Sequence, residues 1–192
     1  MILNARVLHR YQLIALVVLT AATSFLLLAA CGSGEDEESL FPQISDTGHI
    51  LTLDDLLDTA YKESSNYSTD GLPGATDVSY GFLRVDGGDP YDYEVRFYES
   101  HQSAIDQGTA MAIEGTGESA ILSEDDATYK HGVKNRRTII GGGTGGGARS
   151  GIGPKFASYA IFENVVMLCQ GSDAETSIKR CGLLATTLVP NE

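Results

Sequence analysis

Apolar and polar positions divide the chain into an apolar leader, a polar stretch and a longer region of short periodic segments. Residues 13–30 are mostly apolar, whereas residues 32–48 are rich in acidic residues, Gly and Ser and show no periodicity. From residue 49 onward, apolar residues recur at the spacings that are typical of helices and strands. We therefore predict a single domain over residues 49–192, preceded by a leader (1–30) and a flexible acidic tether (31–48).

Helical spacing follows three residues that favour the N-cap position, namely Thr52, Ser100 and Asp173. The segment 101–114 would present a face of small residues, which permits close packing of a helix on a sheet. A shorter basic helix is expected around residues 127–133.

Strands are predicted in two hairpins. The first joins residues 78–85 to residues 93–98 through an Asp-Gly-Gly-Asp-Pro turn. The second joins residues 156–162 to residues 165–169 through a Glu-Asn pair, whose asparagine is expected to adopt the positive φ of such turns. The element order predicts the α+β class, with an antiparallel sheet of two hairpins packed with about three helices over one face, ferredoxin-like in a permuted sense.

The leader carries the features of an export signal. Arg6 and Arg10 precede the apolar run, and an acidic burst follows it. Its end, Leu28-Ala29-Ala30-Cys31, resembles the lipobox of bacterial lipoproteins. The resemblance implies cleavage before Cys31, attachment of a diacylglycerol to its thiol, and a mature chain anchored on the extracytoplasmic side of the cell membrane or outer envelope. The alternative is an uncleaved membrane anchor, for which the apolar run is near the lower limit of length.

Charge narrows the range of partners. The chain has 26 acidic and 13 basic residues, a formal net charge of −13, so nucleic acid and anionic lipid headgroups are disfavoured as partners. In an exported protein the remaining cysteines, Cys169 and Cys181, predict one disulfide. The alternative is a pair of small buried core residues.

The most unusual segment is TIIGGGTGGGARSGIGPK, residues 138–155. It lacks the lysine that a P-loop needs after its last glycine, and it leads into a strand instead of the helix of a dinucleotide site. However, no acidic residue occurs between Ala127 and Lys155, so glycine N–H groups beside arginines could bind a small anion. The candidate anion-binding residues in the loop 136–155 are Arg136, Arg137, Gly145, Gly146, Arg149 and Lys155. The alternative is that this basic segment pairs with the acidic body.

Other chemistry has weaker support. The acidic residues around the first turn, including Asp92 and Glu94, could offer oxygens to calcium, but their spacing fits no EF-hand loop and suits a turn equally well. The histidines lack zinc-ligand spacing, and Ser150 lacks the Gly-x-Ser-x-Gly context of a hydrolase nucleophile. We therefore expect no metal, no cofactor and no catalytic residue.

These observations favour a lipid-anchored envelope protein with a non-catalytic binding or structural role, through a small anion or an envelope protein partner and without nucleic acid. One alternative is an envelope enzyme that acts on an anionic substrate, held by the arginines and served by His131 or Ser150. Another is an accessory subunit of a membrane complex that docks through Tyr67 and Tyr91.

Overall fold

The computed structural model describes residues 40–140 and 151–189, which contain a six-stranded sheet and a separate two-stranded sheet. The strand order of the large sheet is β1-β7-β8-β4-β3-β2. β1 runs parallel to β7, and every other neighbouring pair is antiparallel. The strands are β1 (Ile44–Ser45), β2 (Lys62–Asn66), β3 (Ala75–Leu83), β4 (Tyr91–Tyr98), β7 (Phe156–Phe162) and β8 (Val165–Gln170).

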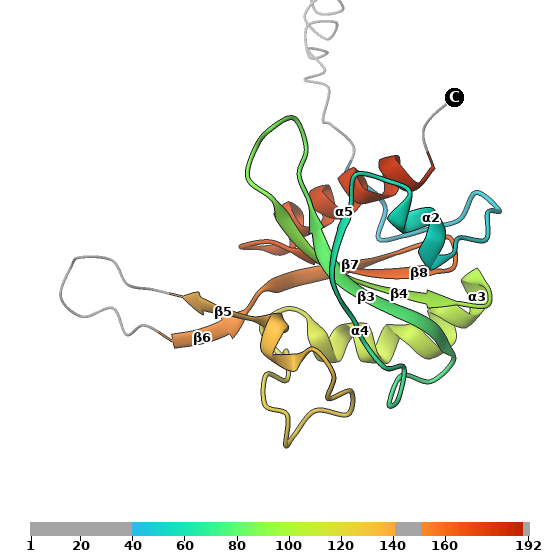
Figure 1. The fold of residues 1–192 in the computed structure, drawn as a ribbon. Helices are drawn as coiled ribbons and strands as arrows, with labels where there is room; N and C mark the ends of the chain where they lie inside the picture. The colour runs from blue at the N-terminus through green and yellow to red at the C-terminus, as the bar shows by residue number, and fades with distance from the viewer. Residues whose placement is uncertain (1–39, 141–150, 190–192) are drawn as a thin grey trace, which may run out of the picture. The chain divides into compact units, whose positions relative to one another are not determined.

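Helices cover both faces of this sheet (Figure 1). On one face, α2 (Leu53–Leu57) and α5 (Ala174–Leu188) share a core cluster with alternate residues of β4 and β8. On the other face lies a continuous helical segment. Its parts are α3 (His101–Ser103), the π-helical turn η1 (Ala104–Gly108) and α4 (Thr109–Gly115).

The predicted α+β class, with its antiparallel sheet of two hairpins, is confirmed by β3–β4 and β7–β8. The expectation that the helices share one face is wrong. Consecutive side chains of a strand point to opposite faces, and β4 is buried from Tyr93 to Tyr98, so both of its faces need cover.

Local signals located the starts of three helices correctly. The three predicted N-caps are confirmed: the side chains of Thr52, Ser100 and Asp173 each accept a hydrogen bond from the backbone N–H three residues later. The helix expected at residues 127–133 does not form. Gly132 adopts a φ of 73°, and only the short 3₁₀ helix η2 (Val133–Arg136) follows it.

Residues 40–48 differ from the flexible tether that the sequence predicts, because they pack against the sheet. β1 pairs with Ile161 and Phe162 of β7. The buried carboxylate of Glu163 accepts hydrogen bonds from three successive backbone N–H groups, those of Thr47 at 2.8 Å, Gly48 at 3.1 Å and His49 at 2.8 Å.

The turn between β7 and β8 contains a second difference. Glu163, and not the asparagine, adopts the positive φ of 53°. The side-chain amide of Asn164 instead accepts a hydrogen bond from the N–H of Leu51 at 2.7 Å and donates one to the carbonyl of Leu51 at 2.9 Å. It also donates to the carbonyl of Tyr98. The turn therefore holds the chain that enters α2.

In the described part of the chain, the buried apolar residues form three clusters, whose members all lie between Leu51 and Ala185. The predicted bond between Cys169 of β8 and Cys181 of α5 is confirmed, with Cα atoms 5.6 Å apart. Residues 40–192 form a compact unit with its own core, so we expect this part of the chain to fold by itself. Among the described residues, no helix has both the length and the apolar character that crossing a membrane requires.

Candidate functional site

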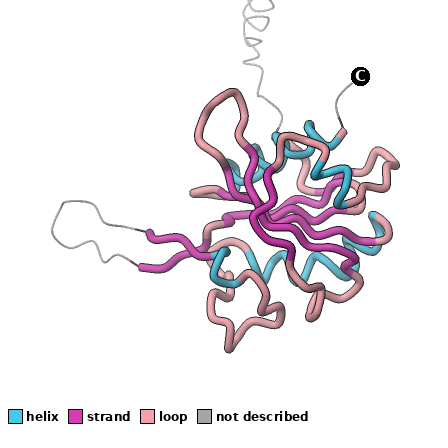
Figure 2. Tube along the Cα trace, in the orientation of Figure 1, coloured by secondary structure: helices cyan, strands magenta, loops and turns pink. Residues whose placement is uncertain are grey.

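The two strands of the small sheet form a ribbon that stands away from the large sheet (Figures 1 and 2). β5 (Arg137–Ile140) pairs antiparallel with β6 (Gly151–Pro154), so that Arg137 is opposite Pro154 and Ile139 is opposite Ile152. We call these two strands the ribbon.

The ribbon exposes apolar side chains. Ile139 is 81% exposed and Ile152 is 64% exposed, although both are large β-branched residues in strands. Residues directly opposite each other in an antiparallel pair share a face. The two isoleucines therefore form one apolar surface, which no described part of the chain covers.

The base of β5 is held by a buried ion pair. Arg136, just before the strand, is 1% exposed and donates from Nε to Oε2 of Glu94 at 2.8 Å and from Nη2 to Oε1 at 3.0 Å. The same guanidinium donates to the carbonyls of Tyr129 and His131 at 3.1 and 2.8 Å. Arg136 therefore joins the ribbon to the middle of β4.

Glu94 also carries a second arginine. Arg96 donates from Nε and Nη2 to Oε1 of Glu94 at 2.9 and 2.7 Å. Both guanidiniums lie over the ring of Tyr129, with Cζ 5.4 Å (Arg96) and 4.8 Å (Arg136) from its centroid. Burial alone would raise the pKa of Glu94, but the two arginines outweigh it and the pKa is lowered, so the carboxylate stays ionised.

The base of β6 is held by a second, half-buried ion pair. Lys155, just after the strand, donates from Nζ to Oδ2 of Asp92 at 2.5 Å and to the hydroxyl of Tyr80 at 2.8 Å. Tyr80 in turn donates to the same carboxylate at 2.9 Å. The backbone N–H of Lys155 donates to the carbonyl of Arg136 at 2.8 Å, which closes the base of the ribbon.

Both supports of the ribbon come from one strand. Asp92 and Glu94 are two residues apart in β4 and so lie on the same face of the sheet. Each binds the cation at the base of one ribbon strand. The ribbon is thus fixed in direction by β4.

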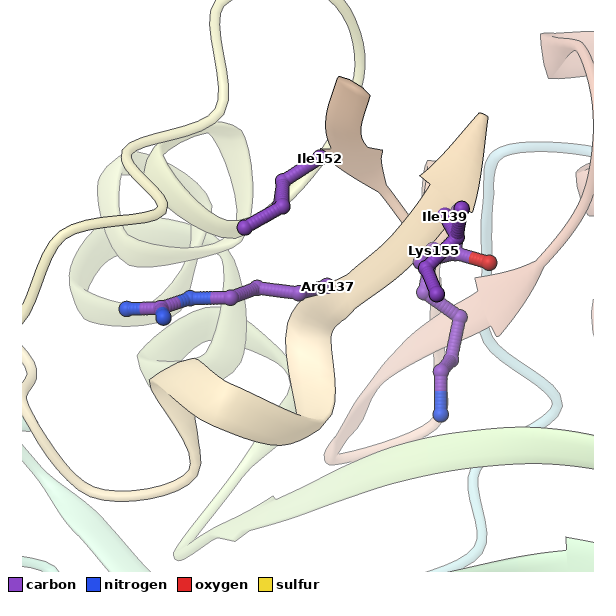
Figure 3. A pocket seen from close by; sticks show the side chains of 5 residues that line it. Arg137, Ile139, Ile152 and Lys155 are labelled. Atoms are coloured by element: carbon purple, nitrogen blue, oxygen red, sulfur yellow. The ribbon is translucent and has the colours of Figure 1, made fainter. Parts of the chain in front are cut away.

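Two open hollows flank the ribbon. The first, of about 490 Å³, is lined by Arg137, Thr138, Ile139, Ile152 and Lys155. Its side chains diverge: Figure 3 shows Arg137 and Ile152 to one side of β5 and Lys155 to the other. The second hollow, of about 400 Å³, reaches Gln170 and Arg180.

Among the described residues that line these two hollows, none is a histidine or carries a carboxylate. Tyr80, the phenol that binds Lys155, has a pKa raised first by burial and then by its hydrogen bond to Asp92, so it keeps its proton. Among the described residues, no three His, Cys, Asp or Glu side chains are grouped to hold a metal ion.

The structure separates the predicted anion-binding residues. Arg136 is a correction: it is buried against Glu94 and presents no charge at the surface. Lys155 pairs with Asp92, as the alternative interpretation expects of a basic segment beside an acidic body. Arg137 is half-buried at the first hollow. Gly145, Gly146 and Arg149 lie outside the described residues, as does the predicted lipidation site, Cys31.

No pattern in the sequence connects Asp92 and Glu94 with the glycine-rich segment. Glu94, Arg96 and Tyr98 alternate with apolar residues, a pattern that usually marks a face of a strand in contact with water. The signal that could have shown their burial is the face of small residues at 101–114. Gly115 confirms that the helix packs closely on this face of the sheet, because an added Cβ would lie 3.5 Å from Nη2 of Arg96.

Comparison with known proteins gives a family and no function. Neither a curated protein nor a solved structure matches the chain. A family model matches residues 52–190, a range that contains the ribbon, both of its ion pairs and the disulfide. The chain therefore belongs to DUF6810, a family of unknown function.

Proposed function

We propose that this protein is a non-catalytic binding protein of the cell envelope, anchored by a diacylglycerol on Cys31, which contacts its partner through the ribbon. The observation that carries the proposal is the exposed pair Ile139 and Ile152, on a ribbon fixed by two ion pairs. Apolar surface that is exposed on an element held at its base favours a contact with another molecule. The anchor is supported by the lipobox-like sequence at residues 28–31.

The two alternatives find less support. For an enzyme acting on an anionic substrate, Arg136, one of the arginines expected to hold the substrate, is buried. His131 contacts the ring of Tyr129 and lines neither hollow. An accessory subunit that docks through tyrosines would need free rings. However, Tyr67 stacks on Tyr80, and Tyr91 lies 3.9 Å beneath Arg180.

The anchor is tested by mass spectrometry of the protein from its native membrane fraction. We expect the first peptide to begin at Cys31 and to carry a diacylglycerol, and Cys31→Ala to lose the modification and the membrane association. An unmodified amino terminus at Met1 in a cytosolic fraction would contradict the anchor.

The contact is tested separately with a photo-crosslinking amino acid at Ile139 in living cells. Ile50 provides a matched control, because it is an isoleucine that is 62% exposed and lies outside the ribbon. We expect an adduct, with lipid or with protein, from position 139 and none from position 50. Equal labelling at the two positions would remove the ribbon as the contact surface.

A further inference from the structure

The ribbon has a charge opposite to that of the whole chain. The net charge is −13, yet residues 128–155 contain no acidic residue. Lys130, Lys134 and Arg137 are the basic residues of this segment that lie in the described part of the chain and are not bound to β4. Of these, Lys134 has its Nζ 3.6 Å from Glu124, in a pair that is exposed to water.

One face of the ribbon combines charge and apolar surface. The register places Arg137, Pro154, Ile139 and Ile152 on the same face, with the arginine at the base and the isoleucines farther out. Figure 3 shows the side chains of Arg137 and Ile152 on the same side of β5. A cation beside aliphatic side chains is the composition of segments that rest at the interface of an anionic membrane.

We infer that this face of the ribbon rests on the surface of a bilayer that contains anionic phospholipid, with the isoleucines at the level of the headgroups and Arg137 beside a phosphate. The inference rests on the proposed anchor, which places the domain beside a bilayer. Net charge alone disfavours such a surface, but residues 128–155, which contain the ribbon, include no acidic residue. Interactions between exposed charges are largely screened beyond a Debye length of about 8 Å at physiological salt, so the charge near the ribbon counts for more than that of the whole chain.

A second copy of the chain fits the ribbon less well. Two isoleucines and a proline on each partner bury far less than the roughly 1,200 Å² of a stable protein interface, and two copies of Arg137 would repel each other. A lipid-anchored domain does not need a large interface. Its contact with the bilayer is intramolecular, with an effective concentration on the order of millimolar, so a small surface is sufficient to orient it.

The test uses residues 40–192, the compact unit without the leader, and vesicles made of equal parts of phosphatidylglycerol and phosphatidylcholine at millimolar lipid, which matches the effective concentration that the anchor gives the contact. We expect the domain to sediment with these vesicles, to be released by high salt and to ignore pure phosphatidylcholine. Ile139→Ser with Ile152→Ser should weaken binding about tenfold, since each removes apolar area at the interface. Ile50→Ser with Ile113→Ser is the control, because these isoleucines are 62% and 50% exposed outside the ribbon. This control variant should bind like the original chain.

A second measurement keeps the apolar surface intact. The chain has no tryptophan, so Ile139→Trp gives a single reporter on the ribbon and Ile50→Trp gives one elsewhere. We expect the emission of the first to shift to shorter wavelength with phosphatidylglycerol vesicles and that of the second to stay unchanged.

Absence of sedimentation together with an unchanged Ile139→Trp emission would overturn the inference. So would a dimer in analytical ultracentrifugation that Ile139→Ser with Ile152→Ser dissociates, because the apolar face would then belong to a second copy. These results are independent of the anchor, which mass spectrometry of Cys31 tests. Vesicle binding with an unmodified Cys31 would contradict the anchor and support the membrane contact, and a lipidated Cys31 without vesicle binding would do the reverse.

Discussion

Arg136 and Arg137 are neighbours in the chain with different surroundings. The first is buried and bound to Glu94, whereas the second is half-buried at an open hollow. Both would serve equally well as anion ligands by residue type. The difference arises because Arg136 ends η2 and faces β4, while Arg137 begins β5.

Replacing each arginine by methionine should separate their roles. Arg136→Met leaves Glu94 buried with one arginine fewer, and removing one partner of a buried ion pair costs about 3–5 kcal/mol. We expect a loss of that order in the free energy of unfolding, measured with urea. Arg137→Met is the matched control and should change it by less than about 0.5 kcal/mol. Equal losses in the two variants would show that Arg136 is not the support of the ribbon.

At the scale of elements, the ribbon depends on β4. A two-stranded ribbon is at best marginally stable by itself in water. Here β4 supplies Glu94 to one base and Asp92 to the other. The element that presents the apolar pair is therefore stabilised from the sheet and not by its own strand pairing.

Asp92→Asn should loosen the ribbon without unfolding the domain. The pair with Lys155 is half-buried, so its loss is worth on the order of 1 kcal/mol. We expect amide exchange in residues 137–140 and 151–154 to become about threefold to tenfold faster, while exchange in β7 and β8 stays the same. Asp89→Asn changes an exposed carboxyl in the turn before β4 and should leave the ribbon unchanged. Faster exchange throughout the sheet would contradict this local role.

Element prediction succeeded where local chemistry decides the structure. The hairpins at β3–β4 and β7–β8 and the N-caps Thr52, Ser100 and Asp173 follow from periodicity and from hydrogen bonds within four residues. The two-residue β1 was missed because it pairs with β7, which is distant in sequence. The polar β2 was missed because its side chains do not alternate between apolar and polar. The ribbon was missed because glycines and a proline make up most of β6.

The candidate site was predicted only in part. The basic glycine-rich segment was identified from its composition, and Ile139 and Ile152 lie in it. The use of Arg136 and Lys155 as supports depends on contacts with residues 42 and 63 positions away along the chain. No local pattern encodes such contacts. The residue types alone therefore indicated a cationic surface, whereas in the fold Arg136 and Lys155 are paired with carboxylates of β4.

At the scale of the whole molecule, the folded unit begins earlier than the periodic pattern indicates. The domain was predicted from residue 49, and the family match begins at residue 52. However, Glu163 takes its backbone donors from residues 47–49, and β1 covers the edge of β7.

A chain that begins at Thr52 should therefore be less stable than one that begins at Leu40. Truncation removes the partners of the Glu163 carboxylate, and a buried charge that loses its hydrogen bonds costs at least about 3 kcal/mol. We expect a loss of that order in thermal or urea unfolding of residues 52–192 relative to residues 40–192. Adding Glu163→Leu to the shorter chain should restore part of the loss, because no charge is then buried. Equal stability of the two chain lengths would contradict the role of residues 44–51 in the fold.

The turn at Glu163 and Asn164 also determines how the domain responds to mechanical load. A pull applied at residue 40 reaches the sheet through the ring of Phe41, which packs on Phe162, and through the hydrogen bonds that the N–H groups of Ile161 and Glu163 donate to the carbonyls of Gln43 and Ser45. It then passes to the carboxylate of Glu163 and the amide of Asn164, both before α2. Force applied at the N-terminal end of the domain is thus borne first by the turn between β7 and β8. Contacts at this turn should break before the force reaches β4, which holds the ribbon.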